Sequence, residues 1–388
     1  MHNKKTIAVI FGGQSVEHDV SIITAHIPVI GSLRASRQFD VFPVYIARDG
    51  SWYSHSTFND LDFFKRADID AFLAKQKKLR LLFDGGLWLE WPGLWGRRVR
   101  IDVAFPAMHG TLGEDGSLMG LLRMAGVPFV GCDIFASAVA MDKSITKRIA
   151  AAQGIPVIPD VVFTRQEWKT DANALRSRIK ELSWPVFVKP VHLGSSIALA
   201  KAKQSFELEN AIEAALHYDD KILVEESIED PIEVTLPIMG NDVLQLAGIE
   251  RPLHSTELFD FNEKYLSGNA KGGGVNRQYS EIPARLDNDT AEQVISYGKR
   301  AYRALGCEGI ARIDFLIKKD SKQVYLVEVN TLPGSLYCHN WRKVGISNSE
   351  LVTRLIMLAE ERFAAQKKIT HAFRSNILQK AGGKKFAD

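Results

Sequence analysis

The segment from Arg312 to Gly334 reads RIDFLI (312–317), KKDSKQ (318–323) and VYLVEVNTLPG (324–334). Two apolar runs rich in Val, Ile, Leu, Phe and Tyr flank a short polar turn, a pattern that predicts an antiparallel β-hairpin. Asp314 interrupts the first run, and Glu328 and Asn330 interrupt the second. Because side chains two positions apart on a strand share a face, Glu328 and Asn330 are expected to point the same way, with Asp314 opposite them.

Three oxygen-bearing side chains on one face of a sheet suit Mg²⁺, which binds carboxylate and amide oxygens and leaves positions for water and phosphate. The alternative interpretation is a solvated sheet face. Solvated faces usually mix charges of both signs, whereas this face collects hydrogen-bond acceptors and has Arg312 as its single cation. The pattern therefore favours a metal site.

The composition is that of an ordinary globular protein large enough for two or three domains. The chain has 388 residues, of which 46% are hydrophobic and 24% are charged. The net charge of +3 is too small to argue for nucleic acid, and no apolar run reaches the length of a membrane span. We therefore expect small-molecule partners, with no nucleic acid and no membrane.

The cysteines and the two ends of the chain bear on the compartment. Cys132, Cys307 and Cys338 are far apart and predict neither a disulfide framework nor a zinc site. The first residues lead directly into a strand-like run, without the pattern of a signal peptide. We expect a cytoplasmic protein whose basic tail, residues 371–388, frays from about residue 379.

The first βα unit places Glu17 where ligands bind. A buried-type strand at 6–11 is followed by a glycine turn and a helical run that extends to about Leu33. Such a turn lies at the carboxyl end of a parallel sheet, although the glycines do not form the dinucleotide fingerprint. Glu17 is either a first-turn acid favoured by the helix dipole or a carboxylate aimed at a ligand's ammonium group, and both interpretations stay open.

A second polar loop follows a later strand. Strands are expected at 41–46 and 102–108, and the segment 51–98, which holds Trp52, Trp88, Trp91 and Trp95, is interpreted as a variable insertion. His109 ends the strand at 102–108 and opens a glycine-rich loop that leads into a helix from Ser117. A lone histidine is usually structural, but a place at the carboxyl end of a strand favours a functional role.

The middle of the chain contains a candidate phosphate site. Lys189 lies in an apolar strand, 186–190, and a loop with Gly194, Ser195 and Ser196 follows it. A lysine beside a loop of backbone donors is a plausible phosphate cradle, although it is not a Walker sequence. Lys143 begins a helix and could reach the same triphosphate. The alternative, two exposed lysines, fits poorly because an unpaired charge in an apolar strand is costly.

Other segments complete the pattern. Strands are expected at 222–226 and from Glu233, and amphipathic helices are expected at 288–305 and 348–366. Residues 262–278 contain four glycines and no apolar periodicity, which suggests a lid over a site.

In combination, these residues resemble the D-alanine–D-alanine ligase family of the ATP-grasp superfamily. The resemblance covers Ile7 to about Glu361, and it is carried by FGGxSxExxVS (11–21), HGxxGEDG (109–116), MDK (141–143), VKPxxxGSS (188–196), KY (264–265), RID (312–314) and EVNTLPG (328–334). It implies an α/β and α+β architecture. A parallel-sheet α/β substrate-binding domain at 1–138 would precede a central ATP-grasp domain at 139–236 and a C-terminal ATP-grasp and metal-binding domain at 237–370.

The resemblance also implies how ATP and metal are bound. ATP would lie between two antiparallel sheets, with Lys143 and Lys189 on its phosphates, Glu225 facing the adenine and Glu233 on the ribose hydroxyls. Ser195, Ser196 and Lys264 would complete the nucleotide contacts. The metal ligands would be Asp314, Glu328 and Asn330, holding two Mg²⁺ ions, with Mn²⁺ as an alternative ion.

The implied reaction is an ATP-dependent joining of two D-alanines through an acyl phosphate, for cell-wall precursor synthesis. Glu17 would meet the ammonium group of the first amino acid, and His109 would lie near its carboxylate. Ser195 and Tyr265 would form a hydrogen-bonded set with Glu17. The oxyanion would face Arg312 and the backbone N–H of Gly334. The family also implies a homodimer.

One segment departs from the family. The small polar segment that usually ends in Ser-Leu is replaced by SLYCHNW at 335–341. His339 and Asn340 can still donate hydrogen bonds to the carboxylate of the second substrate, but Tyr337 and Trp341 add bulk. The loop therefore indicates either a different second substrate or a loop that runs differently and binds D-alanine through its own backbone donors. Two further alternatives do not depend on the loop. Another ATP-grasp ligase would lack Glu17 together with HGxxGEDG, and a non-catalytic nucleotide-binding module is disfavoured because the metal ligands and Arg312 are all present.

Overall fold

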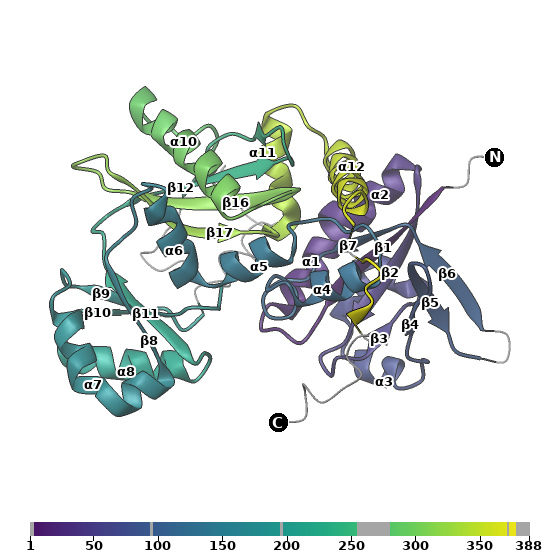
Figure 1. Ribbon diagram of the computed structural model, residues 1–388, viewed down its shortest axis with the longest axis horizontal. Coiled ribbons are helices and arrows are strands. Elements are labelled where there is room, and N and C mark those ends of the chain that lie inside the picture. The colour runs from purple at the N-terminus through teal and green to yellow at the C-terminus, as the bar shows by residue number, and fades with distance from the viewer. Residues whose placement is uncertain (1–3, 94–95, 195–196, 254–279, 371, 378–388) are drawn as a thin grey trace.

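The computed structural model describes residues 4–93, 96–194, 197–253, 280–370 and 372–377. Three four-stranded sheets follow one another along this part of the chain, and helices pack against each of them (Figure 1). The first sheet contains parallel strands and the other two are antiparallel, as the α/β and α+β prediction requires.

The first sheet has the strand order β3-β2-β1-β7. The central strand β1 (Lys5–Gly12) runs parallel to β2 (Phe39–Ile46) and to β7 (Val103–Pro106), while β3 (Trp52–Tyr53) is antiparallel to β2. Six consecutive residues of β1 are buried, as expected for a central parallel strand covered on both faces. The three strands predicted in this region are confirmed.

A helical run follows β1 and holds the first turn in place. It consists of α1 (His18–Thr24), a π-helical turn (Ala25–Ile30) and α2 (Gly31–Ser36). The Ser21 hydroxyl accepts a hydrogen bond from the N–H of Gly12 at 2.8 Å and donates to the carbonyl of Ala107 at 2.8 Å. It thereby ties the ends of β1 and β7 to α1. Two further helices, α4 (Ser117–Met124) and α5 (Ile134–Met141), lead out of this domain.

The tryptophan-rich segment packs against the first sheet. It contains two 3₁₀ helices (Ser56–Asn59 and Leu61–Lys65), α3 (Ile69–Leu73) and an antiparallel sheet of β4 (Arg80–Phe83), β5 (Leu87–Trp91) and β6 (Arg97–Ile101). Trp91 is half-buried and donates from its indole N–H to the carbonyl of Ser54. Trp95 lies outside the described residues.

The central sheet has the order β10-β9-β11-β8 and is antiparallel throughout. Its strands are β8 (Asp160–Thr164), β9 (Val186–Pro190), β10 (Ala200–Ala202) and β11 (Lys221–Glu226). The helices α7 (Arg165–Lys180) and α8 (Ser205–Leu216) cover one face, and α6 (Lys143–Ala152) lies toward the third sheet (Figure 1). Lys189 therefore sits on a central strand between β10 and β11.

The third sheet has the order β13-β12-β16-β17. The predicted hairpin is confirmed as β16 (Ile310–Ile317) and β17 (Val324–Asn330), with β12 (Ile232–Met239) on its other side, β13 (Gln245–Leu246) at the edge, and α10 (Asn288–Ala304) packed against it. All eight residues of β12 pair with β16. The predicted domain boundary at residue 236 falls within β12. A two-stranded sheet of β14 (Arg251–Pro252) and β15 (Ser280–Glu281) lies next to it.

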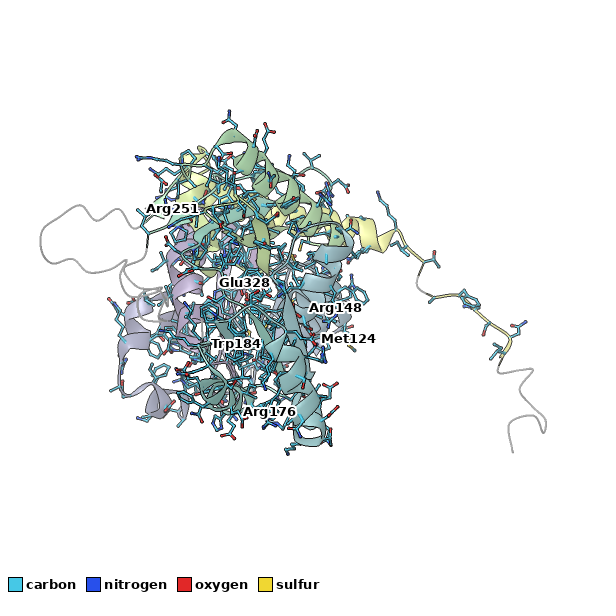
Figure 2. The ribbon with its side chains drawn as sticks, turned by 90° about the vertical axis from the view of Figure 1, so that its left-hand side faces the viewer. Met124, Arg148, Arg176, Trp184, Arg251 and Glu328 are labelled. Atoms are coloured by element: carbon cyan, nitrogen blue, oxygen red, sulfur yellow. The ribbon has the colours of Figure 1, made fainter. Side chains whose placement is uncertain are left out.

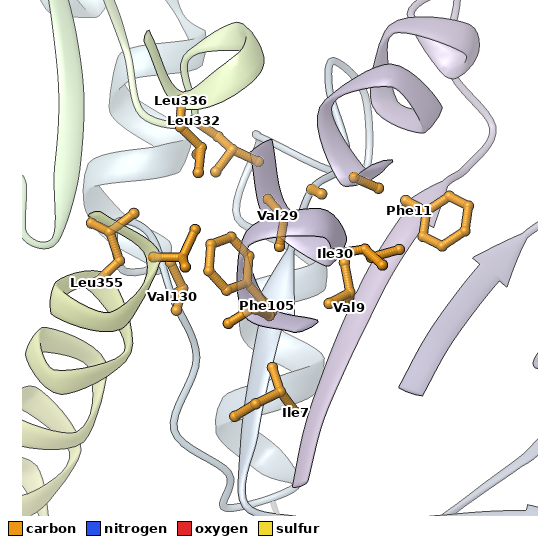
Figure 3. Close-up of a cluster of buried hydrophobic side chains, with 14 of the residues drawn as sticks. Ile7, Val9, Phe11, Val29, Ile30, Phe105, Val130, Leu332, Leu336 and Leu355 are labelled. Atoms are coloured by element: carbon orange, nitrogen blue, oxygen red, sulfur yellow. The ribbon is translucent and has the colours of Figure 1, made fainter. Parts of the chain in front are cut away.

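The C-terminal helices return to the first domain. A 3₁₀ turn (Gly334–Tyr337), α11 (Cys338–Lys343) and α12 (Asn348–Lys367) follow the hairpin. Leu332, Leu336 and Leu355 share a buried cluster with Phe105 and Val130 (Figure 3). The segment after the hairpin is therefore held against β7 by burial of apolar surface, the dominant favourable contribution to folding.

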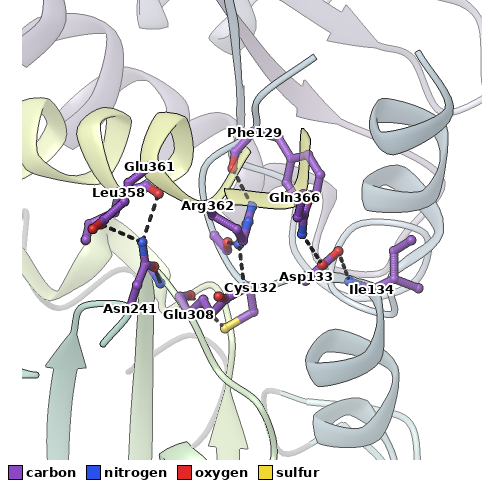
Figure 4. Close-up of polar contacts among 12 residues, drawn as sticks. Phe129, Cys132, Asp133, Ile134, Asn241, Glu308, Leu358, Glu361, Arg362 and Gln366 are labelled. Carbon is purple, nitrogen blue, oxygen red and sulfur yellow. Dashed lines mark hydrogen bonds and ion pairs between the residues drawn. The ribbon is translucent and has the colours of Figure 1, made fainter. Parts of the chain in front are cut away.

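Polar contacts reinforce this return. The guanidinium of Arg362 on α12 donates to the carbonyls of Gly131 at 2.6 Å and Phe129 at 2.7 Å, and Asn241 donates to the carbonyl of Leu358 (Figure 4). Arg362 is buried, and burying a charged guanidinium without hydrogen-bond partners is costly. The carbonyls of Gly131 and Phe129 offset that cost by accepting its hydrogen bonds. Neither α12 nor any other helix within the described ranges is long and apolar enough to cross a membrane.

Candidate active site

The predicted acidic face of the hairpin is present. Asp314 of β16 is the direct partner of Glu328 on β17, and Arg312 is the partner of Asn330. The register shifts immediately after Asp314, between Asp314 and Phe315, as in a β-bulge. Bulges redirect side chains beside active sites. Glu328 lies near the middle of the molecule when it is viewed from the side (Figure 2).

Arg312 neutralises part of this acidic face. Its Nε lies 2.7 Å from Asp314 Oδ1 and its Nη2 lies 2.5 Å from Asp314 Oδ2, while Nη2 is 3.6 Å from Glu328 Oε1. Burial by itself lowers the pKa of Arg312, but the carboxylate of Asp314 outweighs it and holds that pKa well above its usual value. The Tyr337 ring lies under the guanidinium at 5.0 Å, within range of a cation–π contact. Arg312 is therefore a permanent, fixed cation.

Lys143 connects the hairpin to the loop after β9. Its Nζ donates to the carbonyl of Leu193 at 2.6 Å and lies 3.7 Å from Glu328 Oε2. Asp142 caps the N-terminus of α6 by accepting from the N–H of Ile145, and its other oxygen binds Lys221 Nζ at 2.6 Å. The ammonium group of Lys143 thus lies between Glu328, a predicted metal ligand, and the predicted phosphate-binding loop.

A buried charge network surrounds Lys189. Its ammonium group contacts Glu225 Oε1, while Lys147 Nζ lies 2.8 Å from Glu225 Oε2 and 2.6 Å from Asp160 Oδ2. Burial by itself raises the pKa of Glu225, but the ammonium groups of Lys189 and Lys147 outweigh it and lower the pKa to about 2. Glu225 is therefore a buried anion with two cationic partners. The predicted contact of Glu225 with adenine did not anticipate these two lysine partners.

Glu233 lies near the start of β12 in the third sheet. It is exposed on β12 and pairs with Leu316 of β16. Its predicted role at the ribose hydroxyls stays a prediction.

Glu17 and His109 meet at the carboxyl end of the first sheet. Glu17 directly precedes α1 and is buried, as is His109. A Cβ added to Gly110 would lie 2.8 Å from Glu17 Oε2, and one added to Gly194 would lie 3.6 Å from it. The Glu17 carboxylate therefore lies against both predicted glycine-rich loops. This position is typical of a carboxylate that belongs to a site rather than of a solvated first-turn acid.

His109 is held by two neighbours. Its Nε2 is 2.8 Å from Thr24 Oγ1, and its Nδ1 is 3.8 Å from Glu114 Oε1. Glu114 is fixed in turn, because its Oε2 accepts from the N–H of Gly110 at 2.7 Å. Asp115 accepts from the N–H groups of Leu112 and Ser117 and so stabilises the turn before α4.

Candidate residues from the N-terminal and C-terminal parts of the chain line one pocket. Residues from the first domain, from α6, from the loop after β9 and from the hairpin line it together: Glu17, His109, Glu114, Lys143, Gly194, Arg312, Glu328, Asn330 and Gly334. The pocket thus combines the carboxylates of Glu17, Glu114 and Glu328, the cations Lys143 and Arg312, and the amide of Asn330.

The segment after the hairpin has an unusual backbone. Ser335, Leu336 and Tyr337 have φ values of 50°, 51° and 51°, in the left-handed region, although none of them is glycine. Such residues cost roughly 1–2 kcal/mol each and seldom occur in succession. Leu336 is fully buried, and the N–H of Ser335 donates to Thr24 Oγ1 at 3.1 Å. Surrounding contacts therefore hold the backbone beside Gly334 in this conformation.

The structure places His339 and Asn340 differently from the prediction that both face a substrate carboxylate. His339 Nε2 lies 3.0 Å from both oxygens of Glu250, and Asn340 Nδ2 donates to Glu250 Oε2 at 3.4 Å. Asn340 is completely buried, whereas 44% of the His339 side chain is exposed. Asn340 is thus better placed to satisfy Glu250 than to bind substrate.

Several predicted site residues lie outside the described part of the chain: Ser195, Ser196, Lys264, Tyr265 and the segment 262–278. Conversely, sequence reasoning missed Thr24, Lys147 and Glu250. The sequence pattern could have indicated Lys147, because it lies four positions after Lys143 and therefore on the same face of α6. No sequence pattern indicates Thr24 or Glu250, since their partners are distant in sequence.

Two antiparallel sheets, a lysine on a central strand of one and an acidic hairpin in the other define a nucleotide-dependent ligase of the ATP-grasp class. Family models agree with this class and narrow it. The model of the D-ala D-ala ligase N-terminus matches residues 6–132, and the model of the D-ala D-ala ligase C-terminus matches residues 149–357. The chain belongs to the D-alanine–D-alanine ligase family.

Individual relatives match over nearly their whole length. The D-alanine–D-alanine ligase of Acetivibrio thermocellus is 37% identical over 380 residues, which cover 94% of this chain and 98% of the relative. That of Deinococcus radiodurans is 36% identical, with 92% and 99% covered. Among solved structures, the Coxiella burnetii D-alanine-D-alanine ligase has a TM-score of 0.77 at 28% identity, covering 94% of this chain and 96% of that one. The VanG D-Ala:D-Ser ligase of Enterococcus faecalis has a TM-score of 0.74 at 30% identity, covering 92% and 100%.

Proposed function

We propose that the protein is an ATP-dependent, ADP-forming ligase that joins two D-alanines into the dipeptide used for peptidoglycan synthesis. The observation that carries this proposal is the single pocket lined by Glu17 and His109 from the first domain and by Arg312, Glu328 and Gly334 from the last. Curated relatives at 36–37% identity over nearly their entire length bear the name D-alanine–D-alanine ligase.

The acidic face of the hairpin fits divalent cations. Asp314, Glu328 and Asn330 supply hard oxygen donors on one face, the kind that Mg²⁺ prefers. We propose that they would hold two Mg²⁺ ions, with Mn²⁺ as a substitute. Bound metal would supply charge neutralisation on the phosphates of ATP.

The lysines are proposed to receive the phosphates of ATP. Lys143 lies between Glu328 and the carbonyl of Leu193, so its ammonium group is already directed toward the metal face. Lys189, on β9, forms an ion pair with Glu225. Further nucleotide contacts are proposed for Ser195, Ser196, Glu233 and Lys264, with Glu225 lining the adenine side.

The first half-reaction activates a carboxylate. We propose that Glu17 binds the ammonium group of the first D-alanine and that His109 lies on its carboxylate side. A carboxylate oxygen then attacks the γ-phosphorus of ATP, a new P–O bond forms, and ADP leaves. Ser195 and Tyr265, with Glu17, are proposed to close the site, because the resulting acyl phosphate hydrolyses readily in water.

The second half-reaction forms the peptide bond. The neutral amine of the second D-alanine attacks the acyl carbon, and the tetrahedral oxyanion would be stabilised by Arg312 and by the N–H of Gly334. Collapse of the intermediate breaks the C–O bond and releases phosphate, while the amine loses its proton. Removing one donor of this kind typically lowers the rate about a hundredfold or more.

D-Alanine is the second substrate that the comparisons favour. The altered loop at 335–341 suggested a different nucleophile, and one similar solved structure is titled a D-Ala:D-Ser ligase. The curated relatives named above, however, are D-alanine–D-alanine ligases at higher identity. The exposed His339 is retained as a proposed contact to the second substrate.

The oligomeric state and the compartment are proposals as well. Resemblance to the family suggests a homodimer, which sedimentation equilibrium of the purified protein would test by a mass of twice 43.3 kDa. A cytoplasmic location is proposed because the nucleotide substrate is made there, and cell fractionation would test it.

The decisive experiment is an assay of ADP and phosphate release with D- and L-amino acids supplied singly and in pairs. D-Alanine alone should support ADP release, and mass spectrometry should detect D-alanyl-D-alanine in equal amount. An absence of ADP release with D-alanine, under conditions in which the protein is folded and binds ATP, would contradict the proposal.

A further inference from the structure

Thr24 connects two parts of the pocket that come from opposite ends of the chain. Its hydroxyl is fully buried at the end of α1 and contacts the N–H of Ser335 at 3.1 Å and His109 Nε2 at 2.8 Å. Ser335 follows Gly334, whose N–H is the proposed oxyanion donor, and His109 is a proposed neighbour of the first substrate. One hydroxyl therefore touches both the activating and the ligating sides of the site.

Proton counting fixes the direction of these bonds. The N–H of Ser335 can only donate, so Thr24 Oγ1 accepts from it. Within the described ranges, the other hydrogen-bond partner of this hydroxyl is His109 Nε2. If Nε2 also donated, the hydroxyl proton would be buried without an acceptor, which is costly. Thr24 therefore donates to Nε2, and the imidazole proton is placed on Nδ1, facing Glu114 Oε1 at 3.8 Å.

The backbone beside Gly334 needs such a tether. Three successive non-glycine residues, 335–337, are left-handed, a conformation that persists only where neighbouring groups enforce it. Burial of Leu336 fixes one side chain, and the N–H of Leu336 donates to the carbonyl of Pro333 at 2.8 Å. The bond from Ser335 to Thr24 is a contact of this backbone with the first domain.

We propose that Thr24 is a positioning residue that aligns the Gly334 amide with the first-substrate pocket through the chain Glu114–His109–Thr24–Ser335. The inference rests on the proposed ligase function. Phosphoryl transfer to the first D-alanine does not need the oxyanion donor, whereas attack of the amine does. Loss of the Thr24 hydroxyl should therefore slow the second half-reaction more than the first.

The predicted signature is uncoupling. Acyl phosphate that waits for a slower amine attack is hydrolysed: water attacks the acyl carbon, the C–O bond to phosphate breaks, and D-alanine and phosphate are released. The ratio of phosphate released to dipeptide formed should then rise above one. A variant that is merely less well folded would lose both products together and keep that ratio.

The test compares Thr24→Val, which keeps the shape and removes the hydroxyl, with Thr24→Ser, which keeps the hydroxyl. Thr24→Val should lower kcat for dipeptide formation about tenfold or more, because small displacements of catalytic groups have large effects on rate. Its KM for ATP should be unchanged, and its phosphate-to-dipeptide ratio should rise. Thr24→Ser should behave like the wild type. Thr353→Val on α12 is the matched control, since it removes a half-buried hydroxyl that donates to the carbonyl of Ser349 outside the pocket.

The outcomes separate the two proposals. If the wild type forms no dipeptide, the proposed function fails. If the wild type is active and Thr24→Val keeps its rate and coupling, the positioning role is overturned. If Thr24→Val does not fold by circular dichroism, Thr24→Ala replaces it; equal defects in Thr24→Ala and Thr24→Ser would overturn the role, and uncoupling in Thr24→Ala alone would support it. Imidazole ¹⁵N shifts of His109 should report Nδ1–H in the wild type and change in the hydroxyl-free variant.

Discussion

Lys147 and Glu225 lie 78 positions apart in sequence, and their charged groups meet 2.8 Å apart in the interior. Lys147 also binds Asp160, and Glu225 also contacts Lys189, so four charges compensate one another beside the proposed nucleotide site. Buried pairs of this kind contribute little net stability when intact, but removing one partner leaves a charge without compensation.

Replacing Lys147 by Met should therefore destabilise the protein. Asp160 would lose its ammonium partner and Glu225 one of two, and the loss should be about 3–5 kcal/mol in the free energy of unfolding. Urea unfolding followed by fluorescence measures it. Arg148→Met, the exposed neighbour on α6, is the control and should change the free energy by less than about 0.5 kcal/mol. Equal stability of the two variants would contradict the network.

The low pKa of Glu225 makes the stability depend on pH in a definite direction. Its pKa is about 2 in the folded protein and 4.5 as the ordinary value, so the folded state favours the ionised form. This contribution is fully present above pH 4.5 and is lost as the pH falls toward 2. Between pH 5 and pH 3, the free energy of unfolding should fall more steeply for the wild type than for Glu225→Gln. Parallel curves would show that Glu225 is not the titrating group.

The paired carboxylates of the hairpin should be indispensable. Asp314→Asn and Glu328→Gln should each lower D-alanine-dependent phosphate release at least about a hundredfold at saturating Mg²⁺. Each substitution removes a proposed metal ligand and a carboxylate that holds the Arg312 guanidinium in place. Thermal unfolding should show that both variants still fold. Asp320→Asn, in the exposed turn of the same hairpin, is the matched control and should keep full activity. Near wild-type turnover of both carboxylate variants would exclude the metal assignment.

Local patterns predicted the framework of the site. Apolar runs and turns located β1, β2, β7, β9 and the hairpin, and the alternation of side chains placed Asp314 opposite Glu328. These features depend on residues close in sequence, whose geometry is set by the strand itself. The glycine-rich loops were located for the same reason.

The contacts that complete the site could not be predicted in this way. Thr24 meets Ser335 across 311 positions, and Glu250 meets Asn340 across 90 positions. No local periodicity encodes such partners, because they follow from how the sheets and the C-terminal helices pack. The contact of Asn340 was missed for the same reason: its donor was recognised, but its acceptor Glu250 lies on another segment.

The last prediction concerns the loop that departs from the family. His339 is exposed over 44% of its side chain and Asn340 is buried, so the two should respond differently to truncation. His339→Ala should raise the KM for the second D-alanine about tenfold, as expected for loss of a hydrogen bond to a charged group, and leave the KM for ATP unchanged. Asn340→Ala should chiefly lower stability, because Glu250 loses a buried donor. His217→Ala, at an exposed histidine at the end of α8, is the control for His339→Ala.

The measurement is a competition assay with labelled D-alanine as first substrate and D-alanine, D-serine, D-lactate and larger D-amino acids as nucleophiles, in which D-alanine should be preferred. If His339→Ala keeps both the KM and the preference of the wild type, His339 does not contact the second substrate, and the backbone donors of the loop carry that role.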